Sequence, residues 1–299
     1  MKRLSVLCLL VICSLLVGKL WHIAKDGFHI HRTLCQLSEA SLPPPDFPIE
    51  EMLNQTYTYL GRGHQCYAFG SEDGKYVIKL PRFDRYRLSF FLRACPFPFL
   101  RKNREEVRAD LQRRCDFLLE SFRIAFEDLR EETALLYVHL NQTDNLSGSL
   151  KIKDRLGRAY TLDPNRTSFL IQEKKPIMMA CFEEFLRTGN RKGAEEILDS
   201  FLDLVSIRSL KGIYNKDPSF LRNFGWEEGR GVQIDIGSFY RKPFLSAFDA
   251  RDKSFQETAQ HVRNWLQELD PEMLAVFNQK IQAIQNSWPK QGEDLGSQN

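Results

Sequence analysis

Apolar residues follow two different periods along this chain, and the change from one to the other divides it into two parts. Short segments of alternating, β-branched or aromatic residues predict strands, namely Thr56–Leu60, Cys66–Ser71, Tyr76–Leu80, Ala134–Leu140, Ser149–Lys153, Arg158–Leu162 and Ser168–Gln172. Between the third and fourth of these, apolar residues at three- and four-residue steps predict one long helix over Arg101–Arg130. After Pro176 the pattern is helical, over Met178–Arg187, Lys192–Leu210, Phe255–Leu269 and Pro271–Ile284.

The order of these elements predicts an α+β fold with two lobes. The first lobe would hold the sheet and the long helix, and the second would be mainly helical. Asp73-Gly74 lies between two strand patterns and is a strong hairpin signal, so we expect an antiparallel sheet.

The N-terminal part is more apolar than the rest. An uninterrupted apolar run covers Leu4–Gly18, and Leu4–Ile23 is long enough to span a bilayer if Lys19 snorkels and Trp21 lies at the interface. The bulky residues that follow offer no small-x-small cleavage site, so we expect a single-pass membrane anchor with the folded part in the cytosol. The alternative is a cleaved signal peptide and a secreted protein. Seven scattered cysteines without a CxxC pair favour reduced thiols and hence the cytosolic face.

These patterns divide the chain into five segments. We expect an anchor over 1–30, a proline-rich linker over 31–52, a first lobe over 53–174, a second lobe over 175–288 and a polar tail over 289–299.

The charge balance excludes a broad class of partner. Basic residues number 42 and acidic residues 39, which gives a net charge of +3. Such a balance carries no electrostatic signature of a nucleic-acid binder, and we expect no nucleic-acid partner. Basic clusters at Arg82–Arg87 and Lys211–Arg230 could attract a phosphorylated or anionic acceptor, but scattered Arg and Lys are more often plain solvated surface.

Two glycines and a lysine are candidates for phosphate contacts in the first lobe. Gly61 and Gly63 lie between the first two strands, where backbone amides can approach a phosphate without obstruction, although an ordinary hairpin tip also uses glycine. Lys79 lies near the end of an apolar strand. If its ammonium is buried there, it needs an anionic partner. The alternative is a lysine on an edge strand, exposed to water, which needs none.

Three polar residues are candidates in the second lobe. Asp217 and Asn223 lie on a loop after a long helix, where such residues are also common as caps and turn residues. Asp235 follows an apolar strand and precedes Ile236-Gly237, a suitable place for a metal ligand.

The order of these motifs resembles the protein-kinase-like superfamily over about Leu53–Phe239. In the glycine loop, Gly61 and Gly63 match, whereas Cys66 and Ala68 replace the third glycine and the valine. The strand Tyr76-Val77-Ile78-Lys79 corresponds to Val-Ala-Ile-Lys.

The second-lobe motifs match with one difference in spacing. Asn215-Lys216-Asp217 stands where the superfamily has His-Arg-Asp, and Asp235-Ile236-Gly237 corresponds to Asp-Phe-Gly. Asn223 follows Asp217 by six residues instead of the usual five, with Pro218 between them.

The resemblance implies a two-lobed kinase-like fold and an ATP site that uses Mg²⁺. It implies that Lys79 contacts the α- and β-phosphates, that Asn223 and Asp235 bind Mg²⁺, and that Asp217 orients the acceptor hydroxyl and takes its proton. Such a lysine pairs with a helix glutamate, for which Glu120 is our choice and the rivals are Glu105, Glu106 and Glu127. The adenine edge would meet the backbone at Gln172 and Glu173.

The sequence also departs from protein kinases. The part after Gly237 is short and has no Ala-Pro-Glu segment, which favours a smaller kinase-like enzyme with a non-protein or anionic acceptor. The unusual Asp217 loop leaves open a pseudokinase or nucleotide-binding scaffold that acts through protein contacts.

Overall fold

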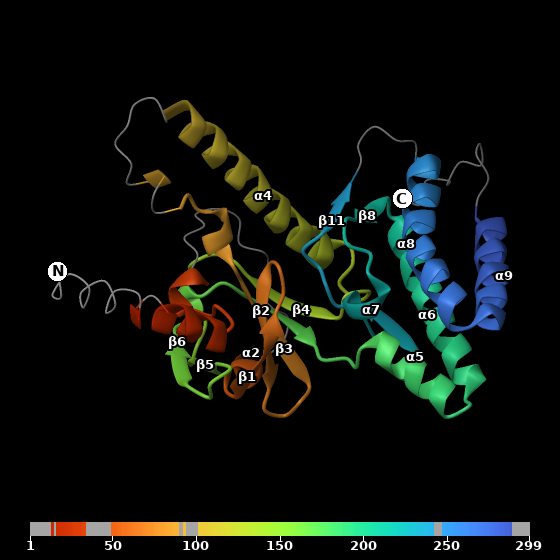
Figure 1. Cartoon of the computed structure of the whole chain (residues 1–299), viewed down its shortest axis with the longest axis horizontal. Coiled ribbons are helices and arrows are strands. Elements are labelled where there is room, and N and C mark those ends of the chain that lie inside the picture. Colours follow the sequence, from red (N-terminus) through yellow and green to blue (C-terminus); the bar gives the residue numbers. More distant parts are fainter. Residues whose placement is uncertain are drawn as a thin grey trace, which may run out of the picture. The chain divides into compact units, whose positions relative to one another are not determined.

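The chain folds into two compact units in the computed structural model (Figure 1). Unit 1 comprises Met1–Cys115 and Leu136–Lys174, and unit 2 comprises Asp116–Leu135 and Lys175–Asn299. The structure describes residues 13–14, 16–33, 49–89, 92–93, 101–241 and 247–288. The expected α+β fold class is confirmed.

Unit 1 is built on a seven-stranded sheet with the order β4-β7-β3-β2-β1-β5-β6. The strands are β1 (Thr56–Arg62), β2 (Cys66–Ser71), β3 (Tyr76–Pro81), β4 (Leu135–His139), β5 (Leu150–Lys153), β6 (Ala159–Leu162) and β7 (Phe169–Glu173). The helical elements η1 (Ile30–Arg32), α2 (Ile49–Leu53), η2 (Phe83–Tyr86) and η4 (Pro164–Arg166) lie before or between these strands. The 27-residue α4 (Arg101–Glu127) belongs to unit 1 up to Cys115 and to unit 2 from Asp116.

The sheet is mixed, which corrects the expectation of an antiparallel sheet. β1 pairs with β2 antiparallel but with β5 parallel, in the register Thr56↔Lys151 to Thr58↔Lys153. A parallel pair needs a long crossover connection, and α4 lies in the chain that connects these two strands. An alternating pattern gives the faces of a strand but not the direction of its neighbour.

One face of the sheet carries the apolar core of unit 1. Tyr67, Phe69, Ile78, Leu80 and Phe169 from three central strands are fully buried there. Alternation along each strand therefore points the intervening residues, including Lys79, to the other face.

The chain ahead of α2 contributes to the same core. Phe28 is 1% exposed, and its ring meets those of Tyr67 and Phe69 edge-on, with centroids 5.1 and 5.4 Å apart. The hydroxyl of Tyr67 donates to the carbonyl of Gly27 at 2.7 Å. Residues 25–33 are thus part of the folded unit.

In the part of the chain that the structure describes, no helix is long and apolar enough to span a bilayer. Half of the anchor expected over Leu4–Ile23, residues 4–12 and 15, lies outside the described residues.

Unit 2 is mainly helical. Besides the C-terminal part of α4, its described helices are α5 (Met178–Arg187), α6 (Arg191–Leu210), α7 (Phe220–Asn223), α8 (Ala247–Leu269) and α9 (Pro271–Ser287). Its two-stranded sheets pair β8 (Ile213–Asn215) with β11 (Phe239–Arg241), and β9 (Phe224–Glu227) with β10 (Arg230–Gln233). Phe201 of α6 lies at the centre of the core and packs edge-on against Phe220 and Phe224.

A buried arginine connects α6 to two neighbouring elements. Arg208 is 1% exposed, and its guanidinium donates to Gln233 Oε1 at 2.7 Å and Thr258 Oγ1 at 2.6 Å. Burial lowers the pKa of Arg208 to about 10, so the group stays charged near neutral pH. Because a buried charge must be hydrogen-bonded, Arg208 constrains where β10 and α8 lie against α6.

Replacing Phe28 tests whether the N-terminal segment stabilises unit 1. We expect Phe28→Ala to lower the free energy of unfolding by about 3 to 5 kcal/mol, because the ring is buried on every side. Chemical denaturation measures this loss. The exposed His31 of the same segment supplies the control, and an equal loss for His31→Ala and Phe28→Ala would contradict the packing described here.

The buried His139 predicts a pH dependence of stability. Its ring stacks on Phe169 at 5.1 Å, and burial lowers the pKa of His139 below 6.5. Below about pH 6.5, His139 therefore binds a proton in the unfolded chain but stays neutral in the folded chain. The free energy of unfolding should then fall as the pH is lowered.

Denaturation curves recorded between pH 7 and 5 measure the slope of the unfolding free energy against pH. His139→Phe should reduce it, while His261→Ala, at an exposed position, should leave it unchanged. Some slope should persist, because burial also lowers the pKa of His29. An unaltered slope in His139→Phe would exclude His139 as a source.

Candidate functional site

The sheet of unit 1 aligns three of the predicted residues on one face. Gly61 pairs with Ala68, Ala68 with Lys79, and Lys79 with Leu170. Directly opposite residues share a face, so these four form a row across β1, β2, β3 and β7. Gln172 pairs with Val77, two residues from Lys79, and lies on the same face. Glu173 pairs with Tyr76, so alternation places it on the opposite face.

The face around Gly61 is open. A Cβ atom added at Gly61 would meet no atom within 4 Å, and the register of β1 against β2 shifts between Tyr59 and Gly61. A β-bulge of this kind turns the strand locally. The backbone at Gly61 is therefore accessible on the face that carries Lys79.

The tip of the β1–β2 hairpin is attached to the chain that follows β3. Gly63 N donates to Cys66 O at 2.9 Å, which closes the turn. Arg82 is 7% exposed, and its guanidinium donates to Gly63 O at 3.1 Å while its backbone N donates to Gln65 O at 2.7 Å. Sequence reasoning grouped Arg82 with a basic cluster and did not identify this role.

In unit 2 the structure brings Asp217, Asn223 and Asp235 together. Asn223 is 6% exposed, and its side-chain Nδ2 donates to the carbonyl of Asp217 at 2.8 Å. Its own carbonyl accepts from Ile234 N at 2.8 Å and from Asp235 N at 3.4 Å. One buried asparagine thus connects two loops that the sequence separates.

The Asp217 loop is fixed through its backbone. Asn215 Nδ2 donates to Asp217 O at 3.1 Å, and Asp217 N donates to Asn215 Oδ1 at 3.0 Å. Lys216 N donates to Ser238 O at 3.0 Å, a second link to the chain after Asp235. The Asp217 residue itself is exposed, so its carboxylate lies in solvent on a loop with a fixed backbone.

The turn at Asp235 depends on a serine that sequence reasoning missed. Ser121 of α4 is fully buried; its Oγ donates to Ile236 O at 2.6 Å and accepts from Phe239 N at 2.7 Å. Gly237 N donates to Asp235 Oδ1 at 3.3 Å and orients that carboxylate. The available signal was a small polar residue on the apolar side of a helix, which is too common to be specific.

Glu120, the predicted partner of Lys79, has a local partner. Its carboxylate pairs with Arg123 one turn along α4, and its side chain is 45% exposed. The pairing of Glu120 with Lys79 stays a prediction.

The side chains at Asn223 and Asp235 suit a hard cation. Asn223 Nδ2 donates to Asp217 O, so its Oδ1 is the side-chain atom that could ligate a cation, and Asp235 could add its carboxylate oxygens. Mg²⁺ is bound through one or two such oxygens together with phosphates and water. Within the described residues, no group of three or more His, Cys, Asp and Glu side chains is placed to hold a metal ion.

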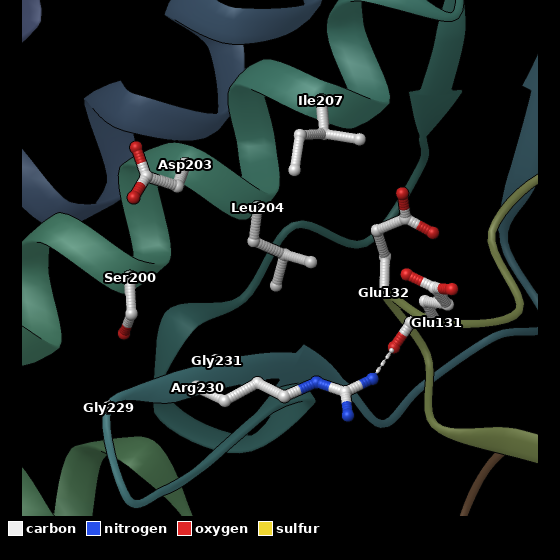
Figure 2. Close-up of a pocket in the computed structure, with 9 residues that line it drawn as sticks. All are labelled: Glu131, Glu132, Ser200, Asp203, Leu204, Ile207, Gly229, Arg230 and Gly231. Carbon is white, nitrogen blue, oxygen red and sulfur yellow. Dashed lines mark hydrogen bonds between the residues drawn. The ribbon is translucent and has the colours of Figure 1, made fainter.

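Unit 2 also has a pocket of about 250 Å³ that contains none of the predicted site residues (Figure 2). Glu131, Glu132 and Asp203 give it carboxylates, and Leu204 lies between them. Arg230 donates to Glu131 O at 2.7 Å. Burial, followed by the charge of Asp199, raises the pKa of Asp203.

Comparison with known proteins gives few matches. No protein-family model matches the chain, and no curated protein matches it. Among solved structures, a medium-resolution structure of the bifunctional kinase-methyltransferase WbdD shares 17% identity with a TM-score of 0.33, over 78% of this chain and 45% of WbdD.

Two other WbdD structures give similar values. A higher-resolution crystal structure shares 16% identity with a TM-score of 0.36, over 80% of this chain and 47% of WbdD. A co-crystal structure with the kinase inhibitor LY294002 shares 15% identity with a TM-score of 0.32, over 80% and 48%. This chain spans less than half the length of WbdD, and the similarity is weak.

Removing the Ser121 hydroxyl tests how the Asp235 turn is held. Ser121→Ala leaves a buried carbonyl and a buried N–H without their partner, so we expect a loss of about 2 to 4 kcal/mol in unfolding free energy. Hydrogen exchange at Phe239 should accelerate, because its amide donates to Ser121.

The matched control is Ser287→Ala, where an exposed Oγ donates to Ile284 O at 2.7 Å. That change should cost less than about 0.5 kcal/mol. Equal effects of the two substitutions would refute the role assigned to Ser121.

Proposed function

We propose that this chain is an ATP- and Mg²⁺-dependent phosphotransferase of the kinase-like type. The observation that carries the proposal is the set of hydrogen bonds by which Asn223 joins the Asp217 loop to Asp235. Phosphoryl transfer depends on positioned charges more than on covalent chemistry, so a buried residue that fixes an acid and a metal-binding carboxylate is what the reaction needs.

Unit 1 supplies the proposed nucleotide contacts. Lys79 would pair with phosphate oxygens, and Gly61, in the same row of the sheet, leaves the backbone accessible to them. The Arg82 guanidinium donates a hydrogen bond to Gly63 O and so restricts the glycine turn. The turn would therefore lose little conformational entropy on binding the nucleotide. Gln172 and Glu173 at the end of β7 would offer backbone groups to the adenine edge.

Unit 2 supplies the proposed acceptor and metal contacts. Asn223 and Asp235 would ligate Mg²⁺, which neutralises phosphate charge when bound. The exposed carboxylate of Asp217 would orient the acceptor hydroxyl and take its proton as transfer proceeds. Glu120 would have to exchange Arg123 for Lys79 to act as the ion-pair partner.

The acceptor is proposed to be a non-protein or anionic molecule, since the chain lacks the Ala-Pro-Glu segment of peptide-binding kinases. We place the enzyme on the cytosolic face of a membrane, attached through its N-terminal apolar run, where ATP is abundant.

A nucleotide-binding scaffold is the alternative. It is favoured by the six-residue spacing from Asp217 to Asn223 and by Pro218, which could direct the Asp217 carboxylate away from an acceptor. The two functions share a nucleotide site and differ in whether Asp217 is needed for turnover.

Thermal unfolding of the full chain with Mg²⁺-ATP tests the nucleotide site. The full chain is required, because Phe28 belongs to the core of unit 1. At a ligand concentration of 100 times Kd, binding should add about 2.7 kcal/mol of stability. Lys79→Ala and Asp235→Ala should abolish this gain, and Lys75→Ala, an exposed lysine on the turn before β3, should keep it.

ATP hydrolysis then separates the enzyme from the scaffold. Asp217→Ala should retain binding and lower the rate by about 10²- to 10⁴-fold. Equal thermal gains in the wild type, Lys79→Ala and Asp235→Ala would exclude the nucleotide site. Hydrolysis unaffected by Asp217→Ala would exclude Asp217 as the catalytic residue.

A further inference from the structure

The helix formed by residues 16–24 ends on the β5–β6 hairpin of unit 1. The guanidinium carbon of Arg158 lies 4.3 Å from the centre of the Trp21 ring. One turn later, Lys25 Nζ donates to the Tyr160 hydroxyl at 3.0 Å and lies 3.7 Å from Asp154 Oδ2. Figure 1 shows this red segment against β5 and β6. The hairpin and the helix end therefore form one surface.

The exposed charge of this hairpin is entirely positive. Lys151, Lys153, Arg155 and Arg158 are exposed, and Asp154 is the acidic residue between Leu150 and Leu162. Asp154 is 2% exposed, and its carboxylate accepts from Tyr160 and from two backbone amides of the turn beside the Lys25 contact. It therefore offers no surface charge to balance the four cations.

Apolar side chains are exposed on the helix that leads into this surface. Leu16, Val17, Leu20 and Ile23 are 55%, 65%, 65% and 58% exposed, and in the sequence they continue the apolar run that starts at Leu4. At the tip of the hairpin, Leu156 is 43% exposed between Arg155 and Arg158. Exposed apolar residues bordered by cations are typical of a surface that contacts a membrane.

We propose that the β5–β6 hairpin binds the headgroups of anionic phospholipids at the bilayer that receives the N-terminal helix. This inference rests on the membrane attachment proposed above and adds a second contact to it. Trp and Tyr side chains prefer the headgroup level, so Trp21 sets the depth of the surface, and Arg158, stacked on Trp21, lies at that level. Arg155 and Lys153 then face the phosphates, and Leu156 faces the acyl boundary.

The attraction between the basic side chains of the hairpin and anionic headgroups is electrostatic, and its magnitude can be stated. A basic residue close to an anionic leaflet strengthens association by about fivefold, and the effect decays within a Debye length of about 8 Å at physiological salt. Lys153 and Arg155 together should therefore give the hairpin a clear preference for anionic over neutral lipid, and salt should reduce this preference.

Hydrogen exchange of the hairpin in reconstituted vesicles tests the proposal. The full chain is inserted into phosphatidylcholine vesicles and into equimolar phosphatidylcholine and phosphatidylglycerol vesicles, and deuterium uptake is followed over residues 150–160. We expect uptake to be slower on the anionic vesicles by at least about fivefold. The variant Lys153→Glu with Arg155→Glu should lose this difference.

The matched control is Lys75→Glu, a charge reversal on the exposed β2–β3 turn at the other end of the same sheet. It should keep the difference between the two vesicles. Equal uptake on both vesicles in the wild-type chain would overturn the proposal, and so would a loss of the difference in Lys75→Glu. Equal slowing by poly(U) on neutral vesicles would indicate a general polyanion surface and would also overturn it.

Vesicle flotation separates this proposal from the functions on which it rests. A chain that floats with both vesicles but shows no lipid-dependent exchange loses only the hairpin contact. A chain that floats with neither loses the membrane attachment as well, while Mg²⁺-ATP binding by thermal unfolding is judged independently of both results.

Discussion

The arrangement of the candidate site in unit 2 depends on one buried asparagine. Asn223 uses its side chain for the carbonyl of Asp217 and its own carbonyl for the amides of Ile234 and Asp235. A residue that is 6% exposed cannot exchange these partners for water without cost, so the two loops are fixed to each other. Ser121 extends the constraint by holding the turn after Asp235 from α4. Buried residues thus hold the backbone of the loops that carry the candidate functional groups.

Unit 1 uses a sheet for the same purpose. Strand pairing places Gly61, Ala68, Lys79 and Leu170 in one row, and the opposite face of those strands is packed with large apolar side chains. Because a slip of one residue would turn Lys79 into the core, the packing of Ile78 and Leu80 fixes the direction of the lysine. The buried residues of each unit therefore orient its candidate residues. Unit 1 does this through strand register, and unit 2 does it through buried hydrogen bonds.

Local patterns were enough to predict most elements and the order of the motifs. The alternation of Ile78, Lys79 and Leu80 shows which residue leaves the core, and periodicity located α4, α5 and α6. Contacts between residues far apart in the sequence could not be predicted from it. Ser121 meets Ile236 across 115 positions, Arg82 meets Gly63 across 19, and Phe28 enters a core formed by strands beyond the proline-rich segment. Nothing in their immediate neighbours distinguishes these residues from ordinary surface or linker residues, because their partners come from the fold.

The position of Lys25 and Phe28 has a mechanical consequence. Among the described residues, the N-terminal segment contacts the sheet through Trp21 and Lys25 at the β5–β6 hairpin and through Phe28 beneath β2. A pulling force on the helix ahead of Lys25 is therefore borne by the edge of the sheet. The load reaches the core of unit 1 through Phe28 only once the contacts of Trp21 and Lys25 have broken.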